Sequence, residues 1–283
     1  MTARALVVTA DDLGLTVGVN RGIRRAHLDG IVTATSLLAV GGAFDDAVRM
    51  LRVTPTLDAG VHLALVGEDP PVLTATEVPT LVDRRGRFPL TYRQFLVRAA
   101  TGRVDDADVR RELQAQLARV RAGGIPVTHL DTHQHVHLWP TVASAVLDLA
   151  AEHGIGHVRL PRSHRAGPVS LGVNALSVAL GRQLRRRGLP VADYAGLDEA
   201  GAMDRGAIGR ALADLAWRRA RGQRAFAEIN VHPGEVDADS ARFAWGYRWA
   251  QELAALVDPG TARDVAAAGF ALVAFSGLPG RPR

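Results

Sequence analysis

Short apolar runs alternate along the chain with longer segments of helical period, which is the pattern expected of a parallel sheet with crossover helices. The apolar runs predict strands at residues 5–9, 31–38, 59–63, 127–131, 157–160, 190–194, 225–231 and 270–275. The segments of helical period predict helices at residues 17–28, 44–51, 106–122, 141–153, 171–187, 205–221 and 240–257. The clearest helix is 106–122, because its apolar residues from Val109 to Val120 recur every three or four positions.

About eight β/α units in 283 residues indicate an irregular (β/α) barrel that forms a single domain over residues 1–283. An open, doubly wound sheet is the alternative arrangement of the same units. Both arrangements predict that reactive side chains lie at the carboxyl ends of the strands, in the loops that follow them.

The segment 67–102 interrupts this alternation, because it has little periodicity and contains Pro70, Pro71, Pro79 and Pro89. Long excursions of this kind in a compact domain are often lids or binding loops. We therefore expect substrate contacts in this segment. A contact between the subunits of a homodimer is the alternative.

The chain contains neither cysteine nor lysine. This composition excludes thiol nucleophiles, thiolate metal sites, disulfides, a lysine Schiff base and a Walker-type phosphate loop. All 34 basic residues are therefore arginines, against 29 acidic residues, for a net charge of +5. The arginines are scattered, and we interpret their only triplet, residues 185–187, as a solvated helix end. We expect no nucleic-acid partner.

No apolar stretch of the chain approaches the roughly 20 residues that are needed to cross a membrane. The first apolar run leads directly into Asp11 and Asp12, without the features of a signal peptide. We therefore expect a cytoplasmic location and no membrane insertion.

The pair Asp11-Asp12 directly follows the first predicted strand. Adjacent carboxylates repel each other unless a positive charge lies nearby, and a metal ion could bind one of them and leave the other free as a base. Either residue could instead cap the following helix. His62 closes the third predicted strand, where it could be a metal ligand or a buried core residue.

The tract from Thr128 to His137 is rich in side chains that bind metals. If the strand continued through this tract, one face would carry His129, Asp131, His133, His135 and His137. Imidazole and carboxylate ligands suit zinc, manganese, iron, cobalt or nickel, and magnesium more weakly. We predict metal binding or catalysis in this tract, with a solvated histidine-rich loop as the alternative.

His232 lies between a predicted strand and a Pro-Gly turn, where it could transfer protons or only bond to the local backbone. Arg159 lies on another predicted strand and must meet a carboxylate, because an unpaired guanidinium there would be costly. Asp11 is one candidate partner. Since acids and histidines follow several strands at the same expected rim, the residues alone predict a metal-dependent hydrolase.

Four motifs in this order resemble the YdjC-like carbohydrate deacetylase family: Ala10-Asp11-Asp12-Leu13-Gly14, Gly60-Val61-His62-Leu63, Asp131-Thr132-His133-Gln134-His135-Val136-His137 and His232-Pro233. The region 72–88 is more similar to the branch of that family that is associated with hopanoid biosynthesis. The chain departs from the family pattern at Leu13, Thr132 and Gln134, where Phe, Ser and His are usual. These departures leave the choice of substrate open.

The resemblance implies an irregular (β/α) barrel that removes an acetyl group from an N-acetylated sugar or glycan, or from a related amide. It implies one divalent ion, with magnesium and zinc as first candidates, held by Asp12, His62 and His133. It further implies that Asp11 is the base and His232 the acid. The residues expected to contact the substrate or to orient these groups are Arg159, Asp131, His135 and His137.

Three other functions fit part of this pattern: a barrel phosphoesterase, an amidohydrolase, and a relative that binds metal without activity. Amidohydrolases typically carry His-x-His after the first strand, where this chain carries two aspartates. Neither the fold nor simple metal binding requires Asp11 and His232, whose presence therefore favours an active hydrolase.

Overall fold

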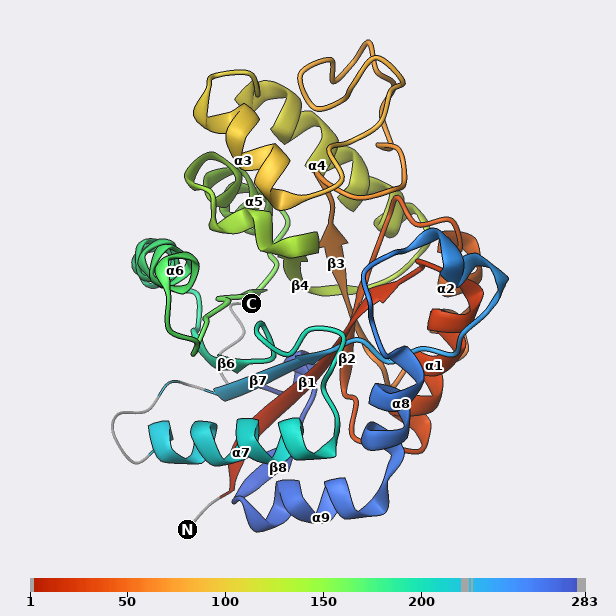
Figure 1. The fold of residues 1–283 in the computed structure, drawn as a ribbon, viewed down its shortest axis with the longest axis vertical. Helices are drawn as coiled ribbons and strands as arrows, with labels where there is room; N and C mark the ends of the chain where they lie inside the picture. Colours follow the sequence, from red (N-terminus) through yellow and green to blue (C-terminus); the bar gives the residue numbers. More distant parts are fainter. Residues whose placement is uncertain (1–2, 220–223, 225, 279–283) are drawn as a thin grey trace.

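The computed structural model describes residues 3–219, 224 and 226–278. In this part of the chain, one curled sheet of eight parallel strands (Figure 1) comprises β1 (Arg4–Leu13), β2 (Ala34–Leu37), β3 (Asp58–Leu63), β4 (Val127–Thr132), β5 (His157–Val158), β6 (Ala192–Ala195), β7 (Phe226–Val231) and β8 (Phe270–Leu272). All predicted strands are present, although β2, β5, β6 and β8 are shorter than predicted. Ala225, the predicted start of β7, lies outside the described residues.

The strand order is β5-β4-β3-β2-β1-β7-β6, and β8 pairs with β1. After β5 the chain continues to β6 at the opposite edge and returns through β7 to β1, which is the course of a barrel. In a doubly wound sheet, the second half of the chain would instead begin beside β1. The predicted irregular barrel is therefore confirmed.

The irregularity of the barrel has two sources. One side of β1 is shared by two strands, because β8 pairs with residues 4–6 and β2 pairs with residues 9–13. Within the described residues, no pairing joins the edge strands β5 and β6. The barrel is therefore open between these two strands.

The helices lie around the outside of the sheet (Figure 1). They are α1 (Val17–Leu28), α2 (Phe44–Arg52), α3 (Tyr92–Ala100), α4 (Asp106–Ala122), α5 (Pro140–Glu152), α6 (Pro168–Arg186), α7 (Arg205–Arg219), α8 (Trp249–Val257) and α9 (Pro259–Ala267). The bounds of α1 and α4 are those predicted, because Thr16 and Asp105 cap their first turns. Residues 220 and 221 of the predicted helix 205–221 lie outside the described part of the chain.

The prediction of a continuous helix over residues 240–257 is wrong. The short 3-10 helix η2 (Ala238–Arg242) is followed by a loop, and α8 begins only at Trp249. Gly246 has a φ of 71°, which a helix does not allow, and the rings of Trp245 and Tyr247 pack together with centroids 5.3 Å apart. This loop therefore carries aromatic rings to the carboxyl rim of the barrel.

Two helices were not predicted, although each has a local start signal. Helix α3 lies inside the segment 67–102 and begins with a capping box formed by Thr91 and Gln94. Helix α9 begins at Pro259, and the side chain of Asp258 caps it. The segment 67–102, in which no helix was predicted, contains α3, and the last predicted helix ends at residue 257, before α9.

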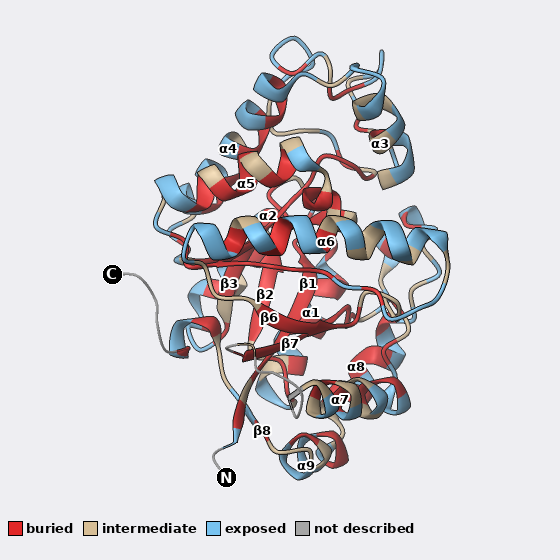
Figure 2. Ribbon diagram, turned by 90° about the vertical axis from the view of Figure 1, so that its left-hand side faces the viewer, coloured by how far each residue is buried: buried red, intermediate tan, exposed pale blue. Residues whose placement is uncertain are grey.

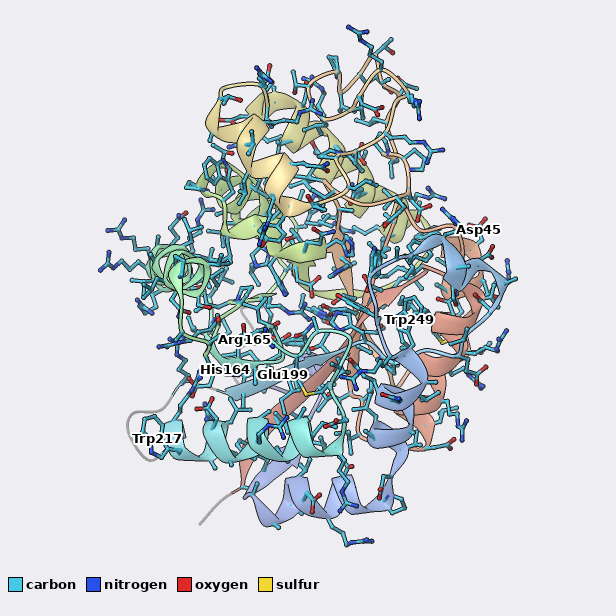
Figure 3. The ribbon with its side chains drawn as sticks, in the orientation of Figure 1. Asp45, His164, Arg165, Glu199, Trp217 and Trp249 are labelled. Atoms are coloured by element: carbon cyan, nitrogen blue, oxygen red, sulfur yellow. The ribbon has the colours of Figure 1, made fainter. Side chains whose placement is uncertain are left out.

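The loops that follow β5 and β6 meet at the carboxyl rim, beside the opening of the barrel. His164 lies 3.0 Å from a carboxylate oxygen of Asp198 and 3.0 Å from one of Glu199. Arg165 also donates to the carbonyl oxygen of Asp198. Figure 3 shows His164, Arg165 and Glu199 close together. These polar contacts connect the two edges that the sheet leaves unpaired.

Burial differs between the sheet and its surrounding helices. Figure 2 shows that the strands are almost entirely buried, whereas α6 and α7 expose much of their surface. Among the described residues, no helix is long and apolar enough to cross a bilayer.

Candidate metal and catalytic site

The structure brings Asp12, His62 and His133 together at the carboxyl rim, from the ends of β1 and β3 and from the turn after β4. Oδ1 of Asp12 lies 3.4 Å from Nε2 of His62 and 3.2 Å from Nδ1 of His133. All three side chains are buried, and their ligand atoms lie within 4.8 Å of one another. The residues expected to bind metal therefore share one point in space.

The backbone at Asp12 differs from the prediction, because β1 continues through Asp11 and Asp12 to Leu13. The register between β1 and β2 shifts after Ala10, and Asp12 has a φ of 67°. This left-handed conformation is costly for a residue other than glycine and often marks functional sites. The bulge points Asp11 and Asp12 into different surroundings.

The carboxylate of Asp12 fits a bound cation. Both of its oxygens are buried, and neither accepts a hydrogen bond within the described residues. Burial would raise the pKa of Asp12, but His133 and His62 outweigh burial and hold the pKa well below its usual range. A buried carboxylate that accepts no hydrogen bond is costly unless a positive charge compensates it.

Asp131 orients His62 toward Asp12. Oδ1 of Asp131 lies 2.6 Å from Nδ1 of His62, which leaves Nε2 directed at Asp12. A carboxylate in this position fixes the tautomer of a metal-binding imidazole. Burial would lower the pKa of His62, but the nearby carboxylates outweigh burial and raise this pKa to about 9. Their field attracts positive charge to Nε2, either as a proton or as a cation.

Asp11 faces a guanidinium and an amide. Its carboxylate accepts hydrogen bonds from Nη1 and Nη2 of Arg159, at 2.6 and 2.8 Å, and from Nδ2 of Asn230 at 3.0 Å. The predicted pairing of Arg159 with Asp11 is confirmed. The alternative that Asp11 or Asp12 caps the next helix is wrong, because Thr16 caps α1.

Arg159 connects three buried carboxylates. Besides Asp11, it contacts Asp131 through Nη2 at 2.8 Å and Glu228 through Nε at 2.8 Å. Burial would lower the pKa of Arg159, but these three carboxylates outweigh burial and raise it. Glu228 and Asn230 lie on β7 and were not among the sequence candidates, although their alternation with His232 places the three on one face of the strand.

The prediction that five side chains of the histidine tract share one face is wrong. Strand β4 ends at Thr132, and the 3-10 helix η1 (His133–Leu138) follows. Gln134 and His135 have φ values of 51° and 55°, and this left-handed turn separates the side chains of the tract. His133 therefore reaches Asp12, whereas His135 lines the same cavity without an ion pair to Asp12 among the described residues.

The remaining histidines of the tract support the structure. Nδ1 of His137 lies 2.6 Å from Oγ1 of Thr132, and its Nε2 lies 3.0 Å from the carbonyl oxygen of Arg159. Burial lowers the pKa of His137 to about 4. Nε2 of His129 lies 3.0 Å from Oγ of Ser36, and burial lowers the pKa of His129 to about 3. Both imidazoles are therefore neutral at physiological pH.

His232 follows β7 and lies across from Asp11, with Nε2 4.0 Å from a carboxylate oxygen of Asp11. Its backbone N–H donates to Glu252 at 2.6 Å, and its ring lies against Tyr247 with centroids 4.9 Å apart. Nδ1 of His232 is buried and has no hydrogen-bond partner among the described residues. The local backbone thus fixes the position of His232 without engaging its ring nitrogens.

The proton-transfer candidates and two of the metal-binding candidates face one cavity of about 330 Å³. This cavity is lined by Asp11, His62, Tyr92, His133, Gln134, His135, Leu197, Ala200, His232, Trp245 and Tyr247. Tyr92 belongs to the segment 67–102, in which substrate contacts were expected. Nε1 of Trp245 donates to Glu68 of the same segment at 2.8 Å. Sequence patterns did not indicate Tyr92, Trp245 or Tyr247, because nothing local to an aromatic residue shows that it faces a distant strand end.

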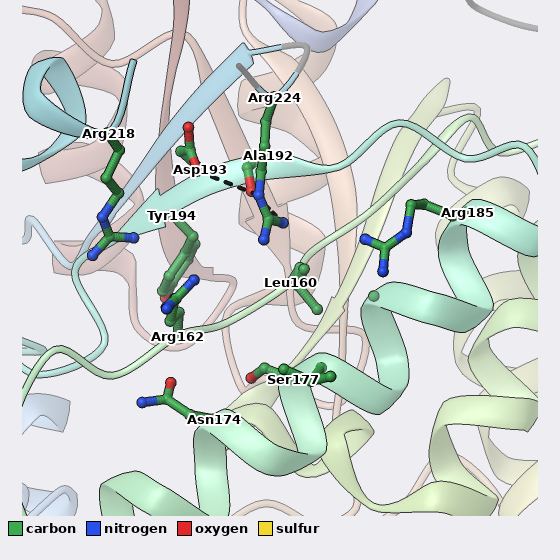
Figure 4. A pocket seen from close by; sticks show the side chains of 12 residues that line it. Leu160, Arg162, Asn174, Ser177, Arg185, Ala192, Asp193, Tyr194, Arg218 and Arg224 are labelled. Atoms are coloured by element: carbon green, nitrogen blue, oxygen red, sulfur yellow. Dashed lines mark hydrogen bonds and ion pairs between the residues drawn. The ribbon is translucent and has the colours of Figure 1, made fainter. Parts of the chain in front are cut away.

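A cavity of about 100 Å³ lies elsewhere, at the opening between β5 and β6, and contains none of the predicted site residues. Figure 4 shows the arginines that line it: Arg162, Arg185, Arg218 and Arg224. Arg185 and Arg186 lie in the exposed last turn of α6, which confirms that the arginine triplet lies at a solvated helix end.

Comparisons with known proteins identify the relatives of this chain. A family model described as YdjC-like protein matches residues 5–267. A carbohydrate deacetylase from Geobacillus stearothermophilus is 32% identical over 96% of this chain and 97% of its own length. A chitooligosaccharide deacetylase from Serratia marcescens is 29% identical over 97% of this chain and 99% of its own length.

Two further matches are a partial one and one that shows only the fold. A carbohydrate deacetylase from Brevibacillus brevis is 40% identical, but the match covers 55% of this chain and 59% of that protein. Among solved structures, a protein described as a cellobiose-phosphate cleavage protein from Enterococcus faecalis V583 has a TM-score of 0.80. It is 24% identical over 97% of this chain and 98% of its own, so it shows a shared fold.

Proposed function

Because the chain belongs to the YdjC-like protein family, we propose that it is a metal-dependent carbohydrate deacetylase that hydrolyses the amide of an N-acetylated sugar or glycan. The observation that carries this proposal is the buried carboxylate of Asp12, which accepts no hydrogen bond and faces His62 and His133. The names of the full-length relatives support acetylated carbohydrate as the substrate class. Residues 1–283 would form one catalytic domain.

Asp12, His62 and His133 would hold one divalent ion. Two imidazoles and one carboxylate favour zinc over magnesium, which prefers oxygen ligands. A divalent ion at this point supplies a Lewis acid that lowers the pKa of water and stabilises the negative charge that develops on the amide oxygen. Asp131 keeps His62 oriented for this role through the contact at Nδ1.

Asp11 is the proposed base. Its carboxylate is adjacent to Asp12 in the chain but faces the cavity beside Arg159, Asn230 and His232. Arg159 and Asn230 fix the orientation of the carboxylate, so that an oxygen of Asp11 accepts the proton of the attacking water at a defined position.

His232 is the proposed acid. An amide nitrogen leaves readily only when it is protonated, and His232 is a second proton-transfer group on the wall of the same cavity. Its backbone bond to Glu252 and the ring of Tyr247 hold the imidazole in place. Nε2 faces the cavity near Asp11 and would donate its proton to the departing amine.

Release of acetate from a panel of N-acetylated sugars and chitooligosaccharides, together with elemental analysis of protein purified without chelator, tests this proposal. We expect one divalent ion per chain, acetate release that a chelator stops, and loss of both the ion and the activity in Asp12→Ala. Hydrolysis of phosphate esters without acetate release would support the phosphoesterase alternative instead. A bound ion without turnover of any of these substrates would support the inactive relative.

A further inference from the structure

The cavity of about 100 Å³ at the opening of the barrel is lined by four arginines from four different parts of the chain (Figure 4). They are Arg162 after β5, Arg185 in α6, Arg218 in α7 and Arg224 before β7. We call this space the arginine cavity. Among its described lining residues, Asp193 on β6 is the one acid, so four positive charges face one negative charge.

The carboxylate of Asp193 does not balance these charges, because two arginines share it. One of its oxygens lies 2.7 Å from Nη2 of Arg4, and the other lies 3.3 Å from Nε of Arg224. Arg162 and Arg185 are exposed and form no ion pair with any described residue. The positive charge of the cavity is therefore only partly compensated within the described part of the chain.

Two of the arginines are largely enclosed, since the side chains of Arg218 and Arg224 are 17% and 29% exposed. Nη2 of Arg218 contacts Asp214 at 2.7 Å, whereas its Nη1 is buried and has no hydrogen-bond partner among the described residues. A buried guanidinium donor without an acceptor is costly. An acceptor on a ligand in the cavity would lower this cost.

The arginines of the cavity also act on one another. Burial lowers the pKa of Arg224, Asp193 opposes this shift, and the charges of the other three arginines add to it. A guanidinium stays protonated in proteins, so it cannot relieve the repulsion by losing its proton. A bound anion would relieve the repulsion instead.

The neutral polar side chains of the lining are already engaged with the protein. Oγ of Ser177 donates to the carbonyl oxygen of Pro161, and Nδ2 of Asn174 donates to a backbone carbonyl oxygen at 3.0 Å. The hydroxyl of Tyr194 donates to Asn230 at 2.6 Å. The guanidinium groups therefore decide which ligand fits, and they favour negatively charged oxygens.

We propose that the arginine cavity binds a phosphate-type dianion, either free inorganic phosphate or the phosphoryl group of a larger molecule. A tetrahedral oxyanion fits several guanidinium groups at once, because each group can donate two parallel hydrogen bonds to it. A volume of about 100 Å³ is below the roughly 300–1,000 Å³ of pockets that enclose a whole small-molecule ligand. The cavity shares no lining residue with the catalytic cavity, and the inference does not depend on the proposed function.

Calorimetric titration of the full chain with inorganic phosphate and with phenyl phosphate, at pH 8 and fixed ionic strength in chloride buffer, tests the proposal. At this pH a phosphomonoester carries two negative charges. Binding of both compounds would assign the site to a phosphoryl group on a larger molecule, and binding of inorganic phosphate alone would assign it to the free ion. At a concentration 100-fold above Kd, the bound compound should raise the Tm by roughly 5–11 °C.

Arg185→Met and its matched control Arg186→Met show where the ion binds. Both arginines lie in the exposed last turn of α6, but only Arg185 lines the cavity, so the two variants change the net charge equally. We expect Arg185→Met to weaken phosphate binding about 10-fold and Arg186→Met to bind like the wild type. Arg162→Met, in a different part of the chain, should weaken binding as Arg185→Met does. Neither Arg162 nor Arg185 forms an ion pair with a described residue, so both variants should fold.

Three outcomes would overturn the site. The first is no measurable binding of either compound. The second is equal phosphate affinity in the wild type, Arg162→Met and Arg185→Met, which would place the ion elsewhere, such as at the proposed metal site. The third is a rise in Tm that is the same in all variants, because phosphate stabilises folded proteins in general by its exclusion from their surface. None of these outcomes affects acetate release, which tests the proposed function separately.

Discussion

Replacement of Arg159 by methionine should strongly destabilise the fold. Methionine replaces the aliphatic part of arginine but has neither its charge nor its hydrogen-bond donors, so Arg159→Met leaves Asp11, Asp131 and Glu228 without the guanidinium that contacts all three at 2.6 to 2.8 Å. Each of these four side chains is at most 2% exposed, so water cannot replace the lost contacts.

The expected loss follows from this burial. Removing one partner of a buried ion pair costs about 3–5 kcal/mol, because the other charge remains buried and uncompensated. With three carboxylates affected, we expect the upper part of that range. For a chain of this size, about 2–4 °C per kcal/mol converts a loss of about 4–5 kcal/mol to a fall in Tm of roughly 8–20 °C.

The matched control is Arg187→Met. Arg187 contacts Asp148 at 2.7 Å, a distance like those at Arg159, but the two side chains are 34% and 27% exposed. Ion pairs that reach solvent contribute only about 0–1 kcal/mol. Urea unfolding of the wild type and both variants at pH 7, followed by circular dichroism, gives the free energy of unfolding of each protein.

Comparable losses in the two variants would refute the reasoning, because burial would then not decide the cost. A loss below about 1 kcal/mol in Arg159→Met would show that the three carboxylates find other compensation in the folded state. A change in the m-value would indicate that the variant alters the compactness of one of the two states.

Four further predictions concern individual site residues. Asp11→Asn should retain fold and metal while turnover of the amide falls about 10²–10⁴-fold, as measured by acetate release. His232→Ala should lose most turnover of an amide but retain much more on an activated ester, whose leaving group needs no proton; equal losses on both substrates would show that His232 is not the acid. Asp131→Asn should weaken metal affinity about 10–100-fold in a competition titration, because His62 loses its orienting carboxylate. Burial raises the pKa of Glu228, so the stability that its proton provides at low pH is lost as pH rises through the folded-state pKa. We therefore expect the free energy of unfolding of Glu228→Gln, measured between pH 4 and pH 7, to increase relative to that of the wild type as pH rises. A difference that does not change with pH would contradict this.

The sequence by itself determined the elements of the fold and the rim at which the chemistry lies. Helices α1 and α4 have the predicted bounds, because their caps and periodicity are local properties of the chain. Parallel strands joined by helices place all carboxyl ends at one rim, so Asp12, His62 and His232 could be placed there from their positions after strands.

Only the tertiary structure decided which side chains act together. In the histidine tract, the left-handed residues Gln134 and His135 direct His133 to Asp12 and place His137 against Thr132 and the carbonyl oxygen of Arg159. In the loop after η2, the predicted helix does not form, because Trp245 packs against His133 and Tyr247 packs against His232. Such contacts depend on the stagger and closure of distant strands, which no local period encodes.

Arg159 illustrates the same division between sequence and structure. The cost of burying a guanidinium required a carboxylate partner, and that much followed from the sequence. The identity of all three partners depended on the barrel, which brings β1, β4 and β7 around one point. The need for a carboxylate partner is a property of the arginine, whereas the identity of the partners is a property of the curled sheet.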